Sequence, residues 1–149
     1  MTSVLLLNGP NLNLLGTRQP EVYGTTTLPQ IEAMCEAHAT PWGWRLASLQ
    51  SNHEGVLIDA LHDAQGVHDG IILNAGGYTH TSIALMDAIS SVGLPVVEVH
   101  LSDIHAREPF RQISYISRVA IAQICGQGPQ GYLQALDTLR VHFKAEHPS

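Results

Sequence analysis

The sequence predicts an α/β protein with a parallel β-sheet covered by helices on both faces. Short, almost continuous apolar runs alternate along the chain with longer stretches in which apolar residues recur every three to four positions. Strands that are apolar throughout are typical of parallel sheets buried on both sides, and the longer stretches are typical of covering helices. Five such strands in 149 residues indicate a flavodoxin-like, doubly wound five-stranded sheet in one domain, residues 1–149.

The first half of the predicted sheet follows from two apolar runs with a helix signal between them. Residues 4–7 form an apolar run that ends at Asn8-Gly9-Pro10, and residues 45–49 form the next run. Between them, Thr27-Leu28-Pro29-Gln30 has the pattern of a capping box with proline in the first turn, which predicts a helix to about residue 38. We expect this helix to bury Ile31, Met34 and Cys35.

The second half repeats the alternation. Further strands are predicted at residues 69–73, 95–99 and 120–125, and a final helix at 132–143. The apolar face of the helix after the second strand is expected to comprise Val56, Leu57, Ala60 and Leu61. A helix over residues 82–91 is expected to place Ile83, Met86 and Ile89 on one face and to end near Gly93.

The composition argues against several classes of function. Nine histidines and six arginines accompany a single lysine, Lys144, which lies in a polar stretch where it is badly placed for Schiff-base catalysis. A formal net charge of −6 argues against non-specific nucleic-acid binding. Cys35 and Cys125 cannot build a disulfide framework, and no apolar run is long enough to span a membrane. We therefore expect a soluble cytoplasmic protein without nucleic-acid or membrane partners.

Polar residues gather where the predicted strands end. Ligands of open α/β sheets bind beyond the carboxyl ends of the strands, so these residues are expected at one edge. They contain no carboxylate cluster of the kind that binds Mg²⁺ or Ca²⁺, and they predict a polyhydroxylated ligand held by hydrogen bonds. They are Asn8, Asn11, Asn13, Gln50, Ser51, Asn52, His53, Asn74, Gly76, Gly77, His80, His100 and Ser102.

A long connection between the first strand and the first helix is a candidate lid, at about residues 16–24. It carries Arg18 and Tyr23 between two glycines that could act as hinges, Gly16 and Gly24. An ordinary surface loop explains the same spacing equally well.

The segment after the fourth strand is a second candidate part of the site. His100 ends that strand, and Arg107 and Arg111 share a face if the following stretch is helical. Such a face would bind a carboxylate, whereas a solvated turn is the alternative for His105 and Arg107. Residues 126–131 match the GxGxxG pattern, but the strand and acidic residue that a dinucleotide site requires do not follow, so a strand–helix turn explains them better.

From the residues alone, three kinds of function remain open. One is an enzyme that uses hydrogen-bonding and acid–base groups at the strand ends. The second is a flavodoxin-like binding module without catalysis, which would not need a tyrosine and an arginine on a lid. The third is a metal-dependent lyase or hydrolase that uses the histidines, which chelator sensitivity would reveal.

The chain resembles the type II 3-dehydroquinate dehydratases over almost its whole length. The resemblance includes two departures, Asn-Ala-Gly-Gly after the third strand where Asn-Pro-Gly-Ala is commoner, and Arg118 where proline is frequent after Ser117. The stretches that carry it are residues 7–16, Arg18-Gln19-Pro20-Glu21-Val22-Tyr23-Gly24, Gln50-Ser51-Asn52-His53-Glu54-Gly55, residues 74–82, Glu98-Val99-His100-Leu101-Ser102, residues 105–108 and Gly131-Tyr132.

The resemblance implies reversible dehydration of 3-dehydroquinate to 3-dehydroshikimate by anti elimination through an enolate, without metal, cofactor or Schiff base. It assigns Tyr23 as the base, Arg18 as the group that stabilises the phenolate, Asn11 as the holder of a water at the enolate oxygen and His100 as the general acid. The residues that the resemblance implies in substrate binding or in support are Asn74, His80, Leu101, Ser102, Arg111, Gly76 and Arg107.

The resemblance also implies an assembly. Family members form a homododecamer built as a tetramer of trimers, and Asp87 is expected to reach the site of a neighbouring subunit. His53 and His105 are further candidates for support of the site.

Overall fold

The computed structural model describes residues 1–147, in which five strands form one parallel sheet of order β2-β1-β3-β4-β5. This is the flavodoxin-like order, so the predicted doubly wound sheet is confirmed. Every strand lies within about two residues of its predicted position, and β5 begins two residues later than expected. The strands are β1 (Ser3–Asn8), β2 (Arg45–Gln50), β3 (Gly70–Asn74), β4 (Val96–His100) and β5 (Ala122–Cys125).

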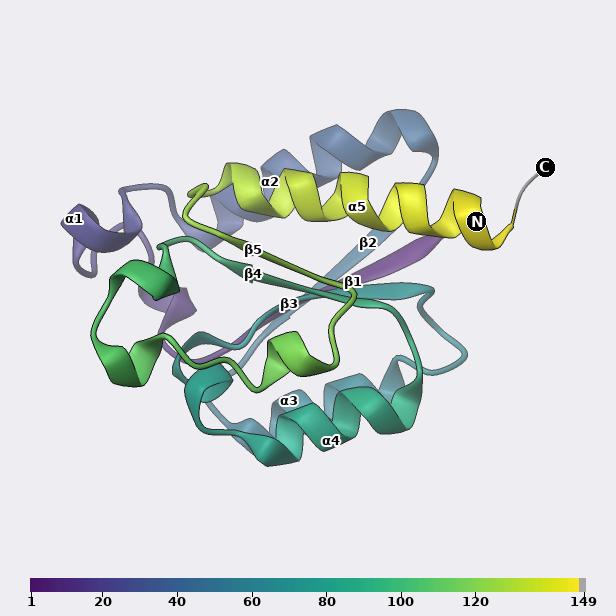
Figure 1. Cartoon of the computed structure of the whole chain (residues 1–149). Coiled ribbons are helices and arrows are strands. Elements are labelled where there is room, and N and C mark those ends of the chain that lie inside the picture. The colour runs from purple at the N-terminus through teal and green to yellow at the C-terminus, as the bar shows by residue number, and fades with distance from the viewer. Residues whose placement is uncertain (148–149) are drawn as a thin grey trace.

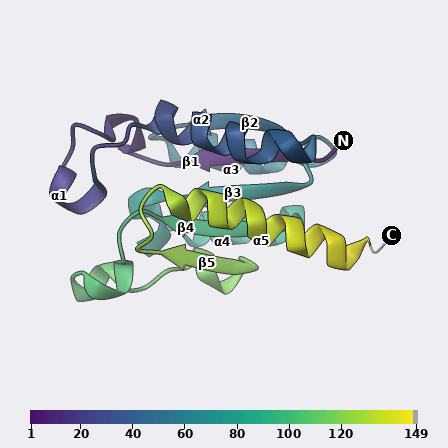
Figure 2. The same ribbon diagram turned by 90° about the horizontal axis from the view of Figure 1, so that it is seen from above.

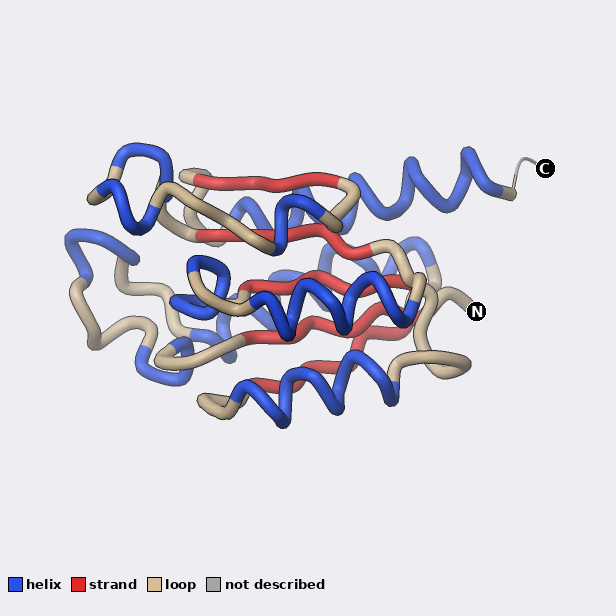
Figure 3. Tube along the Cα trace, turned by 60° about the horizontal axis from the view of Figure 1, so that its bottom comes forward, coloured by secondary structure: helices blue, strands red, loops and turns tan. Residues whose placement is uncertain are grey.

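Two layers of helices cover the sheet. Figure 1 shows α2 and α5 on one face and α3 and α4 on the other, and Figure 3 shows α3 and α4 in front of the strands. A short helix, α1, projects beyond the carboxyl ends of the strands (Figure 2). None of these described helices is long and apolar enough to cross a membrane. The helices are α1 (Pro20–Tyr23), α2 (Leu28–Ala39), α3 (Glu54–Asp63), α4 (Ile83–Val92) and α5 (Gln130–Glu146).

The predicted helix boundaries have the expected local causes. Thr27 and Gln30 form a reciprocal capping box, with the Thr27 amide 2.9 Å from the Gln30 side-chain oxygen and the Gln30 amide 3.3 Å from the Thr27 hydroxyl. The Ser82 hydroxyl accepts the Leu85 amide at the start of α4, and Gly93 ends that helix in the left-handed conformation. Both ends of α4 are therefore specified by local sequence.

Three predicted apolar faces are wrong in part. Ile83 is 52% exposed and Met86 is half-buried, because α4 packs on the sheet through a different stripe. Val56 on α3 is 41% exposed and Met34 on α2 is half-buried. The residues that α4 does bury are Leu85, Ala88, Ile89 and Val92.

Two hydrophobic clusters, one on each face, hold the layers together. Alternate residues of β1 point to opposite sides, so Val4 and Leu6 join the cluster under α2 and α5, whereas Leu5 and Leu7 join the cluster over α3 and α4. Each face of the sheet is thus buried, as the apolar strands predict.

An aromatic group lies at the amino-terminal end of the strands. Trp42 and Trp44 precede β2 with their ring centroids 4.9 Å apart, and Trp44 lies 5.6 Å from Phe143 of α5. The Arg140 guanidinium carbon is 4.5 Å from the centroid of Trp42. This group attaches the end of α5 to the edge strand.

At the opposite, carboxyl edge, the loops after β1 and β3 approach closely. The Gly9 amide donates to the Asn74 carbonyl at 2.7 Å. A Cβ atom on Gly9 would lie 2.5 Å from the carbonyl oxygen of Ala75, which is well inside van der Waals contact. Only glycine at this position lets the two loops meet.

We expect Gly9→Ala to destabilise the fold by about 1–3 kcal/mol, because two backbone segments must move apart. Urea unfolding measures the change. Gly55→Ala is the matched control: its Cβ would enter open space at the start of α3, where alanine is favoured over glycine. Equal stability of the two variants would contradict the close approach.

Candidate active site

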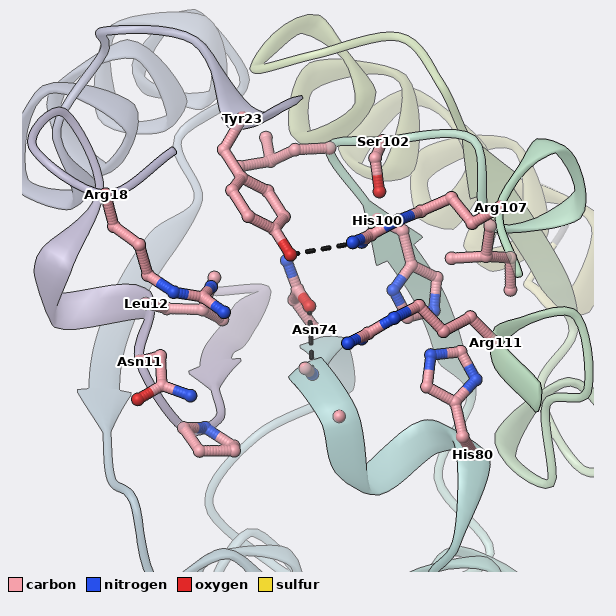
Figure 4. Close-up of a pocket in the computed structure, with 15 residues that line it drawn as sticks. Asn11, Leu12, Arg18, Tyr23, Asn74, His80, His100, Ser102, Arg107 and Arg111 are labelled. Atoms are coloured by element: carbon pink, nitrogen blue, oxygen red, sulfur yellow. Dashed lines mark hydrogen bonds between the residues drawn. The ribbon is translucent and has the colours of Figure 1, made fainter. Parts of the chain in front are cut away.

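A cavity of about 280 Å³ opens at the carboxyl edge of the sheet (Figure 4). Eleven of the twelve residues predicted for the site line it, and the exception is Asp87. They come from the turn after β1, from residues 16–24, from the ends of β3 and β4 and from the loops that follow. The lining residues that were predicted are Asn11, Arg18, Tyr23, Asn74, Gly76, His80, His100, Leu101, Ser102, Arg107 and Arg111.

Tyr23 lies between two guanidinium groups. Its hydroxyl oxygen accepts a hydrogen bond of 3.1 Å from Nη1 of Arg107, and the Arg18 guanidinium carbon is 5.0 Å from the ring centroid (Figure 4). Burial raises the pKa of Tyr23, but the hydrogen bond and charge of Arg107, together with the charge of Arg18, outweigh burial and leave that pKa below its usual value. The phenolate is therefore easier to form here than in water.

Arg107 has a closer relation to Tyr23 than its predicted supporting role implies. The prediction assigned stabilisation of the Tyr23 phenolate to Arg18, yet Arg107 makes the direct hydrogen bond to the Tyr23 hydroxyl. The condition under which Arg107 and Arg111 would share a helical face is not met, because this stretch folds as two short 3₁₀ turns, Ile104–Ala106 and Pro109–Arg111. Both arginines still line the cavity.

The cavity carries an excess of positive charge. Arg18, Arg107 and Arg111 line it, and no carboxylate is among the described residues that do. Arg111 lies beside the Glu108 carboxylate, with Nε 2.7 Å from Oε2, but its N–H is not aligned for a hydrogen bond. This arrangement favours an anionic ligand.

His100 is held by a carboxylate that the sequence analysis did not single out. Glu98 lies two residues before His100 on β4 and is fully buried. Its carboxylate accepts a hydrogen bond of 2.5 Å from Nε2 of His100. Thr79 and Ser114 each donate a hydroxyl to the same carboxylate at 2.6 Å, and Gln123 donates its amide at 3.1 Å. The signal for Glu98 was a lone charge inside the apolar run 96–99.

The Glu98 carboxylate stays ionised despite its burial. Burial raises the pKa of Glu98, but the hydrogen bond and charge of His100 and the two hydroxyl groups more than compensate and lower it. A carboxylate on Nε2 fixes the orientation of the His100 ring and leaves Nδ1 available to a ligand.

His80 forms the wall next to His100. The two rings are stacked, with centroids 6.5 Å apart and planes 18° from parallel. Nδ1 of His80 is 2.7 Å from the carbonyl oxygen of Ile113. Burial, aided by the charges of His100 and Arg111, lowers the pKa of His80. A neutral His80 that donates from Nδ1 presents an acceptor nitrogen to the cavity.

A buried hydrogen-bond chain sets the orientation of Asn74. Its side-chain oxygen accepts the Gly76 amide at 3.1 Å, and its nitrogen donates to the Tyr132 hydroxyl at 3.1 Å. The Tyr132 hydroxyl in turn donates to the side-chain oxygen of Asn8 at 2.6 Å. Complete burial raises the pKa of Tyr132, which therefore remains a neutral donor.

The glycine-rich turn after β5 supports the site without lining it. Gly126 and Gly128 donate their amides to the carbonyl oxygens of Ser102 and Leu101, both at 3.1 Å. The GxGxxG stretch is thus the strand–helix turn that was predicted, and it holds the segment after β4 in place.

Several candidates lie away from the cavity. His53 precedes α3, and His105 contacts Gln123 at 3.0 Å, so neither histidine lines it. Asp87 is exposed on α4, and Lys144 lies near the end of α5. Within residues 1–147, no group of three histidine, cysteine or acidic side chains could hold a metal ion.

Comparisons with known proteins agree on one family. The family model for dehydroquinase class II matches residues 2–140. A 3-dehydroquinate dehydratase of Ruegeria pomeroyi is 68% identical over 98% of each chain, and a catabolic 3-dehydroquinase 1 of Aspergillus fumigatus is 54% identical over 95% of each. The crystal structure of a type II dehydroquinase from Butyrivibrio crossotus superposes with a TM-score of 0.91 at 40% identity, covering 93% of this chain and 97% of that one.

We expect Tyr23 to ionise at a lower pH than an ordinary tyrosine, whose pKa is 10.0. The difference in ultraviolet absorbance between the unmodified protein and Tyr23→Phe, followed through an alkaline titration, isolates this group. Arg107→Met is expected to raise the pKa of Tyr23 more than Arg18→Met, because the hydrogen bond and the charge of Arg107 each lower that pKa more than those of Arg18 do.

Arg118→Met is the control for this titration, because its guanidinium lies over Tyr115 outside the cavity. It is expected to leave the Tyr23 transition unchanged. A Tyr23 transition at the ordinary pH in the unmodified protein would contradict the role of the two arginines.

Proposed function

The chain belongs to the class II dehydroquinase family and dehydrates 3-dehydroquinate, and we propose that Tyr23 and His100 carry out this reaction as an anti elimination through an enolate. The observation that supports this most is the placement of Tyr23 between two guanidinium groups, in one cavity with a carboxylate-bound histidine. An acidified tyrosine is suited to remove a carbon-bound proton, and a histidine is suited to protonate a leaving group.

In the first step, the Tyr23 phenolate removes the proton next to the ketone. The electron pair of that C–H bond forms a carbon–carbon double bond, and the carbonyl oxygen becomes the enolate oxygen. Each unit by which the arginines lower the tyrosine pKa corresponds to about 1.4 kcal/mol of preferential phenolate stabilisation. Arg107 and Arg18 therefore raise the fraction of active base at neutral pH.

Asn11 is proposed to hold the water that stabilises the enolate. It lies in the turn after β1, lines the cavity, and has a left-handed backbone with φ of 68°. A hydrogen bond that strengthens as charge develops on the oxygen lowers the barrier rather than the substrate dissociation constant.

In the second step, His100 delivers a proton to the departing hydroxyl. The enolate electrons re-form the carbonyl and create the conjugated double bond, the C–O bond breaks, and water leaves. The imidazolium that precedes this transfer is stabilised by the Glu98 carboxylate on Nε2. Glu98 thus acts as a positioning residue for the acid.

The remaining cavity groups are proposed to bind the substrate. Asn74 and His80 present hydrogen-bonding groups to the ring hydroxyls, and Arg111 offers a charge to the hydroxyls or the carboxylate. The backbone amides of Leu101 and Ser102 bind the carboxylate. The support for this last assignment is the glycine turn, which holds the segment of Leu101 and Ser102 by its carbonyl groups.

Residues 16–24 are proposed to be an active-site lid on a single catalytic domain, residues 1–149. Gly16 and Gly24 flank it with φ of 93° and 79°, conformations that glycine adopts without strain. Closure would exclude water and strengthen the interaction of Tyr23 with its arginines.

The proposed assembly is a cytoplasmic homododecamer, a tetramer of trimers, in which Asp87 reaches a neighbouring site. Asp87 is exposed and does not line the cavity of its own chain. Ile83 on the same helix is 52% exposed, and Phe110 and Ile113 beside the cavity are 64% and 52% exposed. A neighbouring subunit that covered these residues would remove their apolar surface from water, which favours association.

Tyr23→Phe and His100→Ala are each expected to lower kcat by about 10²–10⁴-fold, because each removes a proton-transferring group. The near-ultraviolet absorbance of the conjugated enone product measures turnover. His53→Ala, outside the cavity, is the control. Near-normal turnover of either catalytic variant, or loss of activity with chelator or borohydride, would contradict the mechanism.

Asp87→Ala and Tyr23→Phe chains are expected to complement each other when co-assembled, although each alone is inactive. Random mixing in equal amounts would give about a quarter of the sites an intact Tyr23 and an intact Asp87 from a neighbour. Persistent inactivity of the mixed assembly would contradict the role of Asp87 across subunits.

Light scattering is expected to show twelve times the mass of the 16.1-kDa chain.

A further inference from the structure

The turn after β2 contacts the site but has no part in the mechanism above. Asn52, in this turn, is exposed and is not among the residues that line the cavity. Its side-chain oxygen nevertheless accepts a hydrogen bond of 3.0 Å from the backbone amide of Asn11. This bond joins residues 41 positions apart in the sequence.

The Asn11 backbone has a conformation that needs support. Its φ of 68° and ψ of −3° lie in the left-handed region, which is sparsely populated although asparagine adopts it more readily than most non-glycine residues. The Asn11 carbonyl oxygen accepts a hydrogen bond of 3.0 Å from the Leu14 amide, which holds the peptide group after Asn11. The hydrogen bond to Asn52 holds the peptide group before Asn11, so both backbone polar groups of Asn11 have a partner.

Asn52 is itself anchored from two directions. Gln50 donates its side-chain amide to the Asn52 side-chain oxygen at 3.2 Å and to the Gly9 carbonyl at 3.0 Å. The Tyr78 hydroxyl donates to the Asn52 carbonyl oxygen at 2.8 Å. The loops after β1, β2 and β3 are thereby joined through this one residue.

We propose that Asn52 is a positioning residue that orients the Asn11 side chain to hold the water at the developing enolate. Its side-chain oxygen holds the Asn11 amide, and the left-handed backbone then directs the Asn11 side chain into the cavity. The inference rests on the proposed role of Asn11 at the enolate. Because that role concerns charge that develops during the reaction, loss of Asn52 lowers kcat and leaves KM nearly unchanged.

Two substitutions separate the acceptor from the shape of the side chain. Asn52→Leu removes the acceptor, and we expect kcat to fall about 10–100-fold because a displaced group stabilises the enolate poorly. Asn52→Asp keeps an oxygen for Asn11 and Gln50, and we expect kcat within about twofold of the unmodified enzyme on the same argument. His53→Asp places the same charge one position away and is the control for electrostatics.

A double-mutant cycle with Asn11→Ala tests whether Asn52 acts through Asn11. If it does, the double variant Asn11→Ala with Asn52→Leu is no slower than Asn11→Ala alone. Thermal unfolding and native mass of each variant confirm that the assembly is intact, and Asn52→Ala replaces the leucine variant if the latter does not assemble.

Three results would overturn the inference. Additive losses in the double variant would show that Asn52 acts independently of Asn11, and an Asn52→Asp variant as slow as Asn52→Leu would exclude the acceptor. Normal turnover in Asn11→Ala would overturn the inference together with the proposed role of Asn11. If Asn11→Ala is itself slow, additive losses overturn only the inference about Asn52 and leave the proposed role of Asn11 in place.

Discussion

A carboxylate buried in the sheet is the interaction on which the site depends. Glu98 has no exposed surface, and a buried carboxylate without partners costs several kcal/mol. Its partners come from the loop after β3, from the segment before β5, from β5 itself and from His100 on its own strand. Satisfying one charge therefore draws these elements onto β4 and, in doing so, fixes the ring of the proposed acid.

A second charge arrangement links binding to chemistry. The three arginines that line the cavity attract an anion, and two of them also lower the pKa of Tyr23. A more acidic tyrosine is more often ionised, but its phenolate is a weaker base, so the best value lies near the working pH. A bound carboxylate would offset part of the guanidinium charge and restore basicity to Tyr23. In the proposed mechanism, substrate binding and base strength therefore share one electrostatic cause.

Much of the fold and most of the cavity could be predicted, because both depend on local patterns. Apolar runs mark strands, Thr27 and Gln30 mark a helix start, and parallel strands bring their carboxyl ends to one edge. The hydrogen-bond partners of the site residues could not be predicted. The hydrogen bond from Arg107 to Tyr23, for example, depends on the path of a loop that contains 3₁₀ turns. The packed face of α4 likewise depends on its rotation against the sheet, and any role of Asp87 depends on another chain.

The aromatic group at the amino-terminal ends of the strands places the tryptophan fluorescence of the protein far from the cavity. Trp42 and Trp44 are the two tryptophans of the chain, and neither lines the cavity at the carboxyl edge. Their emission reports how α5 is attached to the edge of the sheet, with Arg140 and Phe143 as immediate neighbours. The aromatic residue that lines the cavity is a tyrosine instead, Tyr23. Tryptophan emission thus follows the integrity of the scaffold, whereas the absorbance difference between the unmodified protein and Tyr23→Phe follows the site.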